Sequence, residues 1–405
     1  MTGTPTTDRR VAHLGLGAFH RAHQAWYTEH AHDDWRITAF TGRRPDAARL
    51  LAAQRFAYTL IERAADGDTA ETIRSISAAV PGDDARAWLD TIADPRTGVL
   101  TLTVTEPGYA VDAGPPARIA AGLSARRASG AGAIAIVSCD NLPGNGRMLR
   151  DAVLAHARAD AVWITENVAF VDTVVDRITP ATTPADVEAA RELTGVSDPA
   201  VVVTEPFTEW ILHGEFPAGR PAWDAAGARF VDDVAPYEER KLWLLNAGHT
   251  LLAASGRLAG YETVSEAFAD DALRDAVEAL WTEQRAVIDL PPEDLDPWLD
   301  DLRIRFANPR IAHRLDQISR DSATKVPVRI LAPLRRRMEA GLGGGEAQRA
   351  AVGSWIRSLL ELPPPDRTTL DVARMLEPLS DGERIHTVIA HLTPRPHQNP
   401  QGDTK

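Results

Sequence analysis

Short apolar runs alternate with amphipathic stretches from the N-terminus to about position 234. The apolar runs are typical of buried strands, and the stretches between them have helical spacing. We expect strands from residue 11 into a glycine turn, and at 35–41, 99–105 and 133–138, with helices at 20–30, 85–93 and 119–127. Alternating strands and helices predict a parallel, doubly wound sheet, so the expected fold class is α/β.

Helical periodicity dominates from residue 235 onward. The expected helices cover 267–288, 292–304, 326–340, 347–360, 368–375 and 381–390. The last residues are rich in Pro, Gln and Thr, which is typical of a disordered terminus. The sequence therefore predicts an α/β domain at 1–234, an all-helical domain at 235–392 and a disordered tail at 393–405.

Composition narrows the class of protein. The chain has 405 residues and a net charge of −13, with 57 acidic against 44 basic residues, which argues against non-specific nucleic-acid binding. No apolar stretch approaches the roughly 20 residues of a membrane span, and the N-terminus lacks a secretory signal, so we expect a cytoplasmic protein. Cys139 is the only cysteine, which excludes a disulfide framework and a thiolate zinc cluster.

The first candidate site is the turn Gly15-Leu-Gly17-Ala-Phe19-His20-Arg21. It follows a predicted strand and opens a predicted helix, which is the context of a dinucleotide-binding turn. Gly15 would make the tight turn, Gly17 would let the backbone approach a pyrophosphate, and Arg21 would add a cation. We take Phe19 as part of the same cofactor-binding segment. His20 stands at the third glycine position, so a chance Gly-x-Gly stays open as the alternative.

The second predicted strand ends in Thr41-Gly42-Arg43-Arg44, and Asp46 is the nearest acid. An acidic residue there would bind the ribose of NAD, whereas the two arginines could accept the 2′-phosphate of NADP. NAD is our first choice, and NADP stays open. The histidines at positions 13, 20, 23, 30 and 32 invite a metal site, but carboxylate or thiolate partners are not at ligand spacing, so we predict no metal.

Lys241, Asn246 and His249 form the second candidate site, on a predicted helix that begins near Pro236. At about 100° per residue, Asn246 would lie roughly 140° and His249 roughly 80° around the helix from Lys241. An amine, an amide and an imidazole facing one cavity suit a site for sugar-like hydroxyls. The alternative is a solvated lysine, a capping asparagine and a core histidine with its hydrogen bonds satisfied.

Several ordered segments resemble the mannitol dehydrogenase family, also called the polyol-specific long-chain dehydrogenases. The resemblance lies in residues 13–24, 103–109, 138–146, 175–180, 203–207, 219–223, 241–249, 305–309 and 325–327. It implies a Rossmann-type domain followed by a helical domain. It also implies metal-independent, NAD(P)-dependent oxidation of a secondary alcohol on a polyol or sugar acid.

The resemblance assigns roles to individual residues. Lys241 matches a catalytic lysine that acts as general acid and base, and Asn141 and Asn246 match catalytic asparagines that hold the developing oxyanion. Glu106 matches a carboxylate that relays protons, and His249, Asp176 and Lys325 match substrate-binding positions. The lysine role also makes chemical sense, because desolvation would lower a pKa that is about 10.4 in water toward the working range.

Departures from the family pattern bear on the substrate. The region 107–137 is short, Asp321-Ser-Ala-Thr-Lys325 is unusual, and Gln317 replaces an arginine of the mannitol 2-dehydrogenases. Gln317 and Ala18 favour D-mannonate/D-fructuronate, as in fructuronate reductases; mannitol/fructose or another polyol is the alternative. Arg310, Arg314 and Arg320 could meet a carboxylate or be surface charges. A non-catalytic dinucleotide sensor is the alternative from another class, and the sequence does not indicate an oligomeric state.

Overall fold

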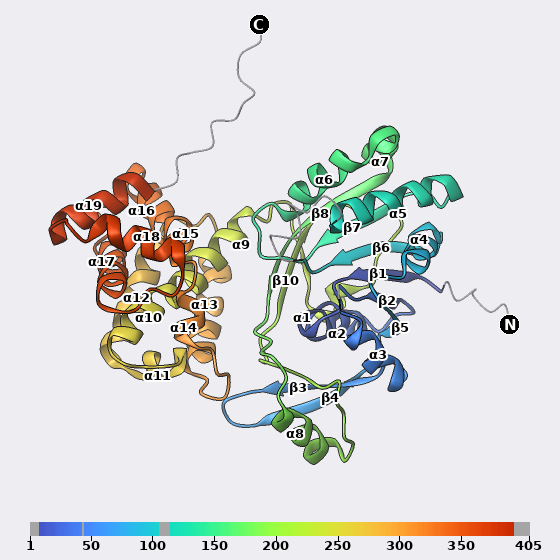
Figure 1. The fold of residues 1–405 in the computed structure, drawn as a ribbon, viewed down its shortest axis with the longest axis horizontal. Coiled ribbons are helices and arrows are strands. Elements are labelled where there is room, and N and C mark those ends of the chain that lie inside the picture. The colour runs from blue at the N-terminus through green and yellow to red at the C-terminus, as the bar shows by residue number, and fades with distance from the viewer. Residues whose placement is uncertain (1–7, 43, 105–113, 393–405) are drawn as a thin grey trace, which may run out of the picture. The chain divides into compact units, whose positions relative to one another are not determined.

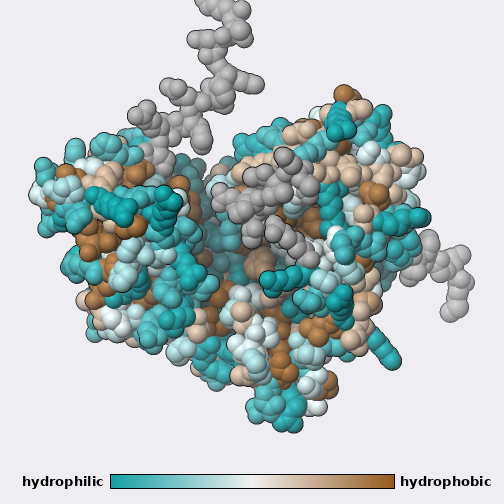
Figure 2. All heavy atoms as spheres, in the orientation of Figure 1, coloured by the Kyte–Doolittle hydropathy of each residue, from teal (hydrophilic) through white to brown (hydrophobic). Residues whose placement is uncertain are grey.

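The computed structural model describes residues 8–42, 44–104 and 114–392. The chain divides into two compact units, Met1–Ala235, which we call the sheet unit, and Pro236–Lys405, the helical unit. The predicted tail at 393–405 lies outside the described residues. In the view of Figure 2, hydrophilic side chains predominate on the surface of both units.

An eight-stranded sheet forms the centre of the sheet unit, in the order β11-β10-β8-β7-β6-β1-β2-β5 (Figure 1). The strands are β1 Arg10–Leu14, β2 Arg36–Phe40, β5 Ile76–Val80, β6 Thr97–Leu102, β7 Ile134–Ser138, β8 Val168–Asp176, β10 Glu209–His213 and β11 Arg229–Phe230. The six strands from β5 to β8 are parallel, and their order is that of a doubly wound dinucleotide-binding sheet. The predicted α/β fold class is confirmed.

Helices cover both faces of this sheet, as Figure 1 shows. One face carries α1 Ala18–Ala22, α2 Gln24–His30 and α3 Asp46–Ala53; the other carries α4 Ala85–Ala93, α5 Pro115–Ser129, α6 Asn145–His156 and α7 Ala161–Asn167. Neighbouring residues of β1 enter different cores, Val11 on the first face and Ala12 on the second. Burial on both faces explains why the parallel strands are continuous apolar runs rather than alternating ones.

A second, three-stranded sheet has the order β4-β3-β9, with β3 Tyr58–Arg63, β4 Asp68–Ile73 and β9 Val202–Thr204. The helix α8 Pro184–Thr194 packs beside β4. No strand was expected in any of these segments. The helix expected at 20–30 is two helices, because the backbone at His23 leaves the helical region at φ −120° and ψ −86°.

The helical unit contains no strand of the sheets just described. Its helices are α9 Ala235–Arg240, α10 Asn246–Leu258, α11 Val264–Ala269, α12 Asp271–Arg285, α13 Pro292–Ala307, α14 Leu315–Ser319, α15 Ser322–Val326, α16 Ala332–Glu339, α17 Glu346–Glu361, α18 Arg367–Leu376 and α19 Asp381–Leu392. Two five-residue π-helical segments interrupt them, Lys241–Leu245 and Pro327–Leu331. In the described part of the chain, every helix is too short or too polar to cross a bilayer.

Two helices that the sequence predicts as uninterrupted are divided in the structure. The helix expected at 267–288 is divided at Asp270, whose backbone is extended and whose side chain caps the next helix by accepting from the Leu273 amide at 3.0 Å. The helix expected at 326–340 consists of the last residue of α15, Val326, then the π-helical segment Pro327–Leu331 and then α16.

Candidate active site

The turn after β1 requires glycine at position 15. Gly15 has φ +114°, and a Cβ there would clash with the Thr103 carbonyl oxygen. The Gly15 and Leu16 amides both donate to the Phe40 carbonyl at the end of β2, each at 2.9 Å. The turn is therefore fixed between β2 and β6, at the carboxyl edge where ligands of doubly wound sheets bind.

Gly17 is different, because the fold does not require it. Its φ is −139°, and among the described residues a Cβ would meet only the Gly15 carbonyl oxygen, at 3.6 Å. A Cβ would fit among the described residues, so what its absence provides is open backbone immediately before α1. That arrangement fits the pyrophosphate of a dinucleotide, whose approach a side chain would block.

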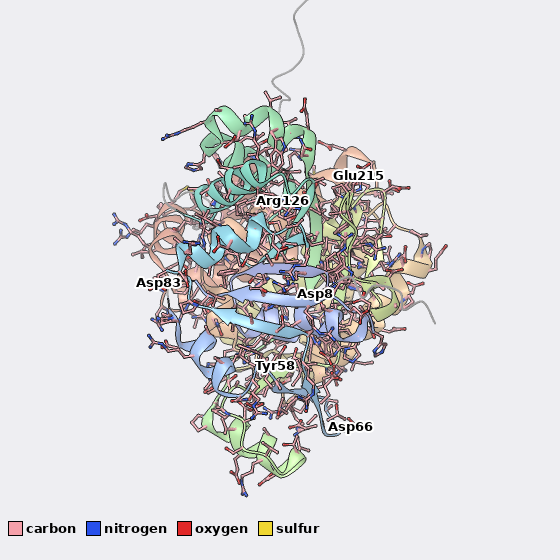
Figure 3. The ribbon with its side chains drawn as sticks, turned by 90° about the vertical axis from the view of Figure 1, so that its right-hand side faces the viewer. Asp8, Tyr58, Asp66, Asp83, Arg126 and Glu215 are labelled. Carbon is pink, nitrogen blue, oxygen red and sulfur yellow. The ribbon has the colours of Figure 1, made fainter. Side chains whose placement is uncertain are left out.

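Arg21 and Phe19 contact residues that surround the turn. Arg21 donates through Nε to the Gly17 carbonyl at 3.2 Å and through NH1 to the Ala200 carbonyl. Tyr58 on β3, labelled in Figure 3, donates its hydroxyl to the Arg21 carbonyl at 2.6 Å. Phe19 stacks on His23 with ring centroids 5.1 Å apart. Both residues hold the turn in shape, and their direct contact with a cofactor stays a prediction.

Two histidines near this turn are buried inside the sheet unit. His13 and His20 are fully buried and stack at 3.3 Å, and burial lowers the pKa of His13 to about 3. Thr103 donates its single hydroxyl proton to the Gly15 carbonyl at 2.9 Å, so the neutral His13 ring donates from Nε2 to Thr103, at 3.3 Å. Among the described residues, no three His, Cys, Asp or Glu side chains are grouped as metal ligands would be.

Asn141 and Asp176 lie at the same carboxyl edge of the sheet as the glycine turn. Asn141 is exposed in the turn after β7, and Asp176 is the buried last residue of β8. Asn145 clamps this turn: its amide nitrogen donates to the Asp140 and Thr173 carbonyls at 3.1 and 3.0 Å, and its oxygen accepts from the Thr173 amide at 2.9 Å. The sheet unit thus brings Asn141, Asp176 and the turn to one edge.

One helical face carries Lys241, Asn246 and His249, and we call it the site face. The three residues share it because the helix contains a π-helical turn, which the sequence did not predict. The Asn246 amide donates to the Lys241 carbonyl, so five residues rather than four separate the ends of this turn. One extra residue moves Asn246 to roughly 40° and His249 to roughly 20° from Lys241. The wider angles expected from the sequence were wrong, because they assumed an uninterrupted α-helix.

Side chains stabilise the two π-helical segments by hydrogen bonds to their carbonyls. Trp281 Nε1 donates to the Leu244 carbonyl at 2.9 Å. In the second segment, the Val328 carbonyl accepts from Trp243 Nε1 at 3.1 Å, and the Arg329 carbonyl accepts from Gln284 Nε2 at 2.8 Å. A wider turn gives up α-helical hydrogen bonds, and buried carbonyls need such replacement donors.

His249 is not a core histidine with satisfied hydrogen bonds. It is 5% exposed, stacks on Phe306 at 4.6 Å and meets the edge of His313 at 4.6 Å. Its buried Nε2 has no hydrogen-bond partner among the described residues. Burial, followed by the charge of His313 and Arg305, holds its pKa well below the usual value, so the ring is neutral. A buried, unpartnered and neutral imidazole nitrogen fits a substrate hydroxyl.

Lys325 is a half-buried cation of the helical unit. Its ammonium donates to the Ile318 carbonyl at 3.4 Å and to the Arg320 carbonyl. Burial, and then the charge of Arg329, lowers its pKa. Arg314, one of the candidate carboxylate partners, is an exposed surface charge paired with Glu262 and Asp316, each at 3.1 Å. Glu106 lies outside the described residues.

Comparison with known proteins bears on both units. Residues 9–225 match the family model of the mannitol dehydrogenase Rossmann domain, and residues 233–357 match that of the mannitol dehydrogenase C-terminal domain. The chain belongs to the mannitol dehydrogenase family. Members of this family are oxidoreductases that act on CH–OH groups of polyols or sugar acids, and the chain is a polyol or sugar-acid dehydrogenase of this family.

Similar proteins in this family have different substrates. D-mannonate oxidoreductase of Escherichia coli (strain K12) is 37% identical over 388 residues, covering 86% of this chain and 80% of that protein. Mannitol 2-dehydrogenase of Cereibacter sphaeroides is 35% identical over 379 residues, covering 83% and 79%. The ternary complex of Pseudomonas fluorescens mannitol 2-dehydrogenase with NAD and D-mannitol matches with a TM-score of 0.79 and 30% identity, over 96% and 92% of the two chains.

The sequence interpretation missed residues that shape the site face of the helical unit. Trp281 and Arg329 lie outside the candidate motifs, and only their hydrogen bonds reveal a part in the site. Pro327 inside a predicted helix was a usable signal, since helices are interrupted at proline and at π-bulges. For Trp281 we find no such signal in the sequence.

Proposed function

We propose that this chain interconverts a sugar acid and its keto form by metal-independent, NAD(P)-dependent hydride transfer, with D-mannonate and D-fructuronate as the best candidate pair. NAD is the preferred cofactor, and NADP is the alternative. The observation that carries the proposal is the shared face of Lys241, Asn246 and the unpartnered His249 Nε2 in the helical unit. We assign dinucleotide binding to residues 1–234, which also supply Asn141, Glu106 and Asp176, and we assign the general acid and base to residues 235–392.

The proposed chemistry gives each group one task. In oxidation, the neutral Lys241 amine takes the hydroxyl proton while bound NAD accepts hydride from the same carbon; in reduction, the ammonium returns the proton. Asn246 donates from its amide to the reacting oxygen, and we assign Asn141 the same task. Removing one such donor typically lowers kcat by about 100- to 1000-fold. His249 stays neutral and holds a neighbouring hydroxyl, as the lowered pKa requires.

The remaining assignments rest on the family resemblance. Asp176 and Lys325 are proposed to bind substrate hydroxyls, and Glu106 to relay the proton from Lys241 to solvent. The buried position of Asp176 and the half-buried one of Lys325 are consistent with such contacts. Gly15, Gly17, Phe19 and Arg21 are proposed to form the cofactor turn.

The choice of a sugar acid is supported by two observations. The Escherichia coli relative at 37% identity is a D-mannonate oxidoreductase. By the family resemblance, Gln317 stands where the mannitol 2-dehydrogenases carry a substrate-contacting arginine. Mannitol 2-dehydrogenase activity is the alternative, because relatives with that name are only slightly less similar.

A substrate panel tests this proposal. The purified chain is assayed for reduction of fructuronate, tagaturonate, fructose and fructose 6-phosphate with NADH and with NADPH. We expect kcat/KM for fructuronate to exceed that for fructose by at least about 100-fold, which corresponds to roughly 2.7 kcal/mol of discrimination. Equal or better reduction of fructose would assign the chain to the mannitol 2-dehydrogenases instead.

The metal-free mechanism is tested separately. Exhaustive dialysis against EDTA should leave kcat unchanged, because lysine supplies the acid and base. Loss of activity that zinc restores would contradict this part of the proposal.

A further inference from the structure

Arg329 is a partly buried cation in the second π-helical segment. Its NH1 donates to the Asn246 carbonyl at 3.3 Å and to the Thr250 hydroxyl at 3.1 Å. No carboxylate in the described part of the chain forms an ion pair with it. Burial lowers its pKa to about 10, so the guanidinium stays charged at neutral pH. A cation that is partly withdrawn from water and lacks a counterion gains from binding an anion.

The Arg329 guanidinium forms hydrogen bonds through one of its three nitrogens. Arg126, labelled in Figure 3, is buried, and it uses Nε, NH1 and NH2 to bind five backbone carbonyls: those of Ile92, Asp94, Ala131, Gly132 and Ala133. Arg329 uses NH1 alone. Its Nε and NH2 have no partner among the described residues, yet they are not sealed from solvent, unlike Nε of Arg337. Nε and NH2 form the edge of a guanidinium that binds a carboxylate through two parallel hydrogen bonds.

Arg329 lies beside the site face of the helical unit. It contacts the backbone of Asn246, and its charge contributes to lowering the pKa of both His249 and Lys325. Two of the residues proposed to bind substrate are therefore within electrostatic reach of the same unpaired cation. The carboxylates of Asp321 and Asp366 raise the pKa of Lys325 and so oppose the effect of Arg329 there. The pKa of Arg329 itself is lowered by burial.

We infer that Arg329 binds the carboxylate of the sugar-acid substrate and so selects it over a neutral ketose. This inference rests on the proposed function and names the residue that sets its substrate class. Binding supplies the missing counterion, and the fixed NH1 contacts hold the free edge in place. A neutral sugar brings a hydroxyl to this position and leaves the cation unpaired. Arg329 therefore takes the role that the sequence left open for Arg310, Arg314 or Arg320.

The test is a comparison of substrates in Arg329 variants. In Arg329→Gln, kcat/KM for fructuronate should fall by about 30-fold to several thousand-fold, the usual range when one partner of a buried charge pair is removed. The loss should appear mainly in KM, and kcat/KM for fructose should change by less than about fivefold. Arg329→Lys keeps the charge but loses the paired donors, so it should recover only part of the loss.

Arg314→Gln is the matched control, because it removes an exposed arginine that already has two carboxylate partners. It should leave both substrates unaffected. Circular dichroism and Tm show that each variant is folded, and NADH binding, measured by fluorescence, shows that the cofactor site is intact. If Arg329→Gln lowers fructuronate and fructose equally, Arg329 only supports Asn246 and the inference is wrong, although the proposed function stands. If the wild-type chain prefers fructose, the proposed function fails first. A wild-type preference for fructose 6-phosphate that Arg329→Gln removes would assign the cation to a phosphate instead.

Discussion

The indole nitrogen of Trp281 offers a direct way to perturb the π-helical segment that aligns the site face. Trp281 is 1% exposed, and its Nε1 donates to the Leu244 carbonyl at 2.9 Å. Trp281→Phe keeps an aromatic ring in the core but removes the donor. The buried carbonyl then lacks a partner, which costs about 1–3 kcal/mol. In a unit of this length each kcal/mol lowers Tm by roughly 2–4 °C, so a loss of about 2 kcal/mol lowers it by roughly 4–8 °C.

The assay combines calorimetry, steady-state kinetics and NADH binding. We expect kcat to fall about tenfold or more, because the segment holds Asn246 and His249 over Lys241 and small displacements of reacting groups are costly. The dissociation constant for NADH should stay within about twofold, because the glycine turn belongs to the sheet unit. Trp88→Phe is the control: this buried tryptophan also donates to a backbone carbonyl, that of Arg118, at 2.9 Å.

The control variant should lose stability without losing kcat. If Trp281→Phe also loses stability while it turns over at the wild-type rate, the π-helical segment does not organise the catalytic groups. The reasoning from the shared helical face would then be refuted.

Two further predictions concern the cofactor turn and the buried histidines. Gly17→Ala should weaken NADH binding by about tenfold or more while Tm changes little, because the described residues leave room for a Cβ and a bound pyrophosphate would not; unchanged NADH binding would remove Gly17 from the cofactor site. Burial lowers the pKa of His313 to about 4. Between pH 6.5 and about 4, His313 is therefore protonated in the unfolded chain and neutral in the folded chain. Stability should therefore fall by about 1.4 kcal/mol per pH unit for this histidine as pH drops from 6.5 to about 4. Urea unfolding of His313→Gln should show a shallower pH slope, whereas His386→Gln, at an exposed position, should keep the wild-type slope.

The sequence predicted the parallel sheet well, because buried strands and crossover helices leave strong local patterns. The helix expected at 85–93 is α4 Ala85–Ala93, with the same ends. The sequence did not predict the second sheet, because β4 is largely polar and β9 pairs with β3 although the two strands lie far apart along the chain. Pairing at such a separation has no local signal.

The residues of the candidate site were proposed from the sequence and stay a prediction, whereas the geometry that the structure gives them was not expected. Hydrophobic periodicity does not report one extra residue in a turn, so the angles from Lys241 to Asn246 and His249 were wrong. The extra residue depends on donors from elsewhere, such as Trp281, whose contact spans 37 positions of the chain. Likewise, the sequence does not show which nitrogens of Arg329 lack a hydrogen-bond partner, because this depends on the contacts that the folded chain makes.

The central claim is that Lys241 supplies the proton transfer, and single-turnover hydride transfer in Lys241→Ala tests it most directly. The variant should bind NADH as the wild type does, and its rate of fructuronate reduction should fall by about 100- to 10,000-fold, the usual contribution of a general acid or base. A variant that keeps a rate within a few-fold of the wild type would show that another group moves the proton.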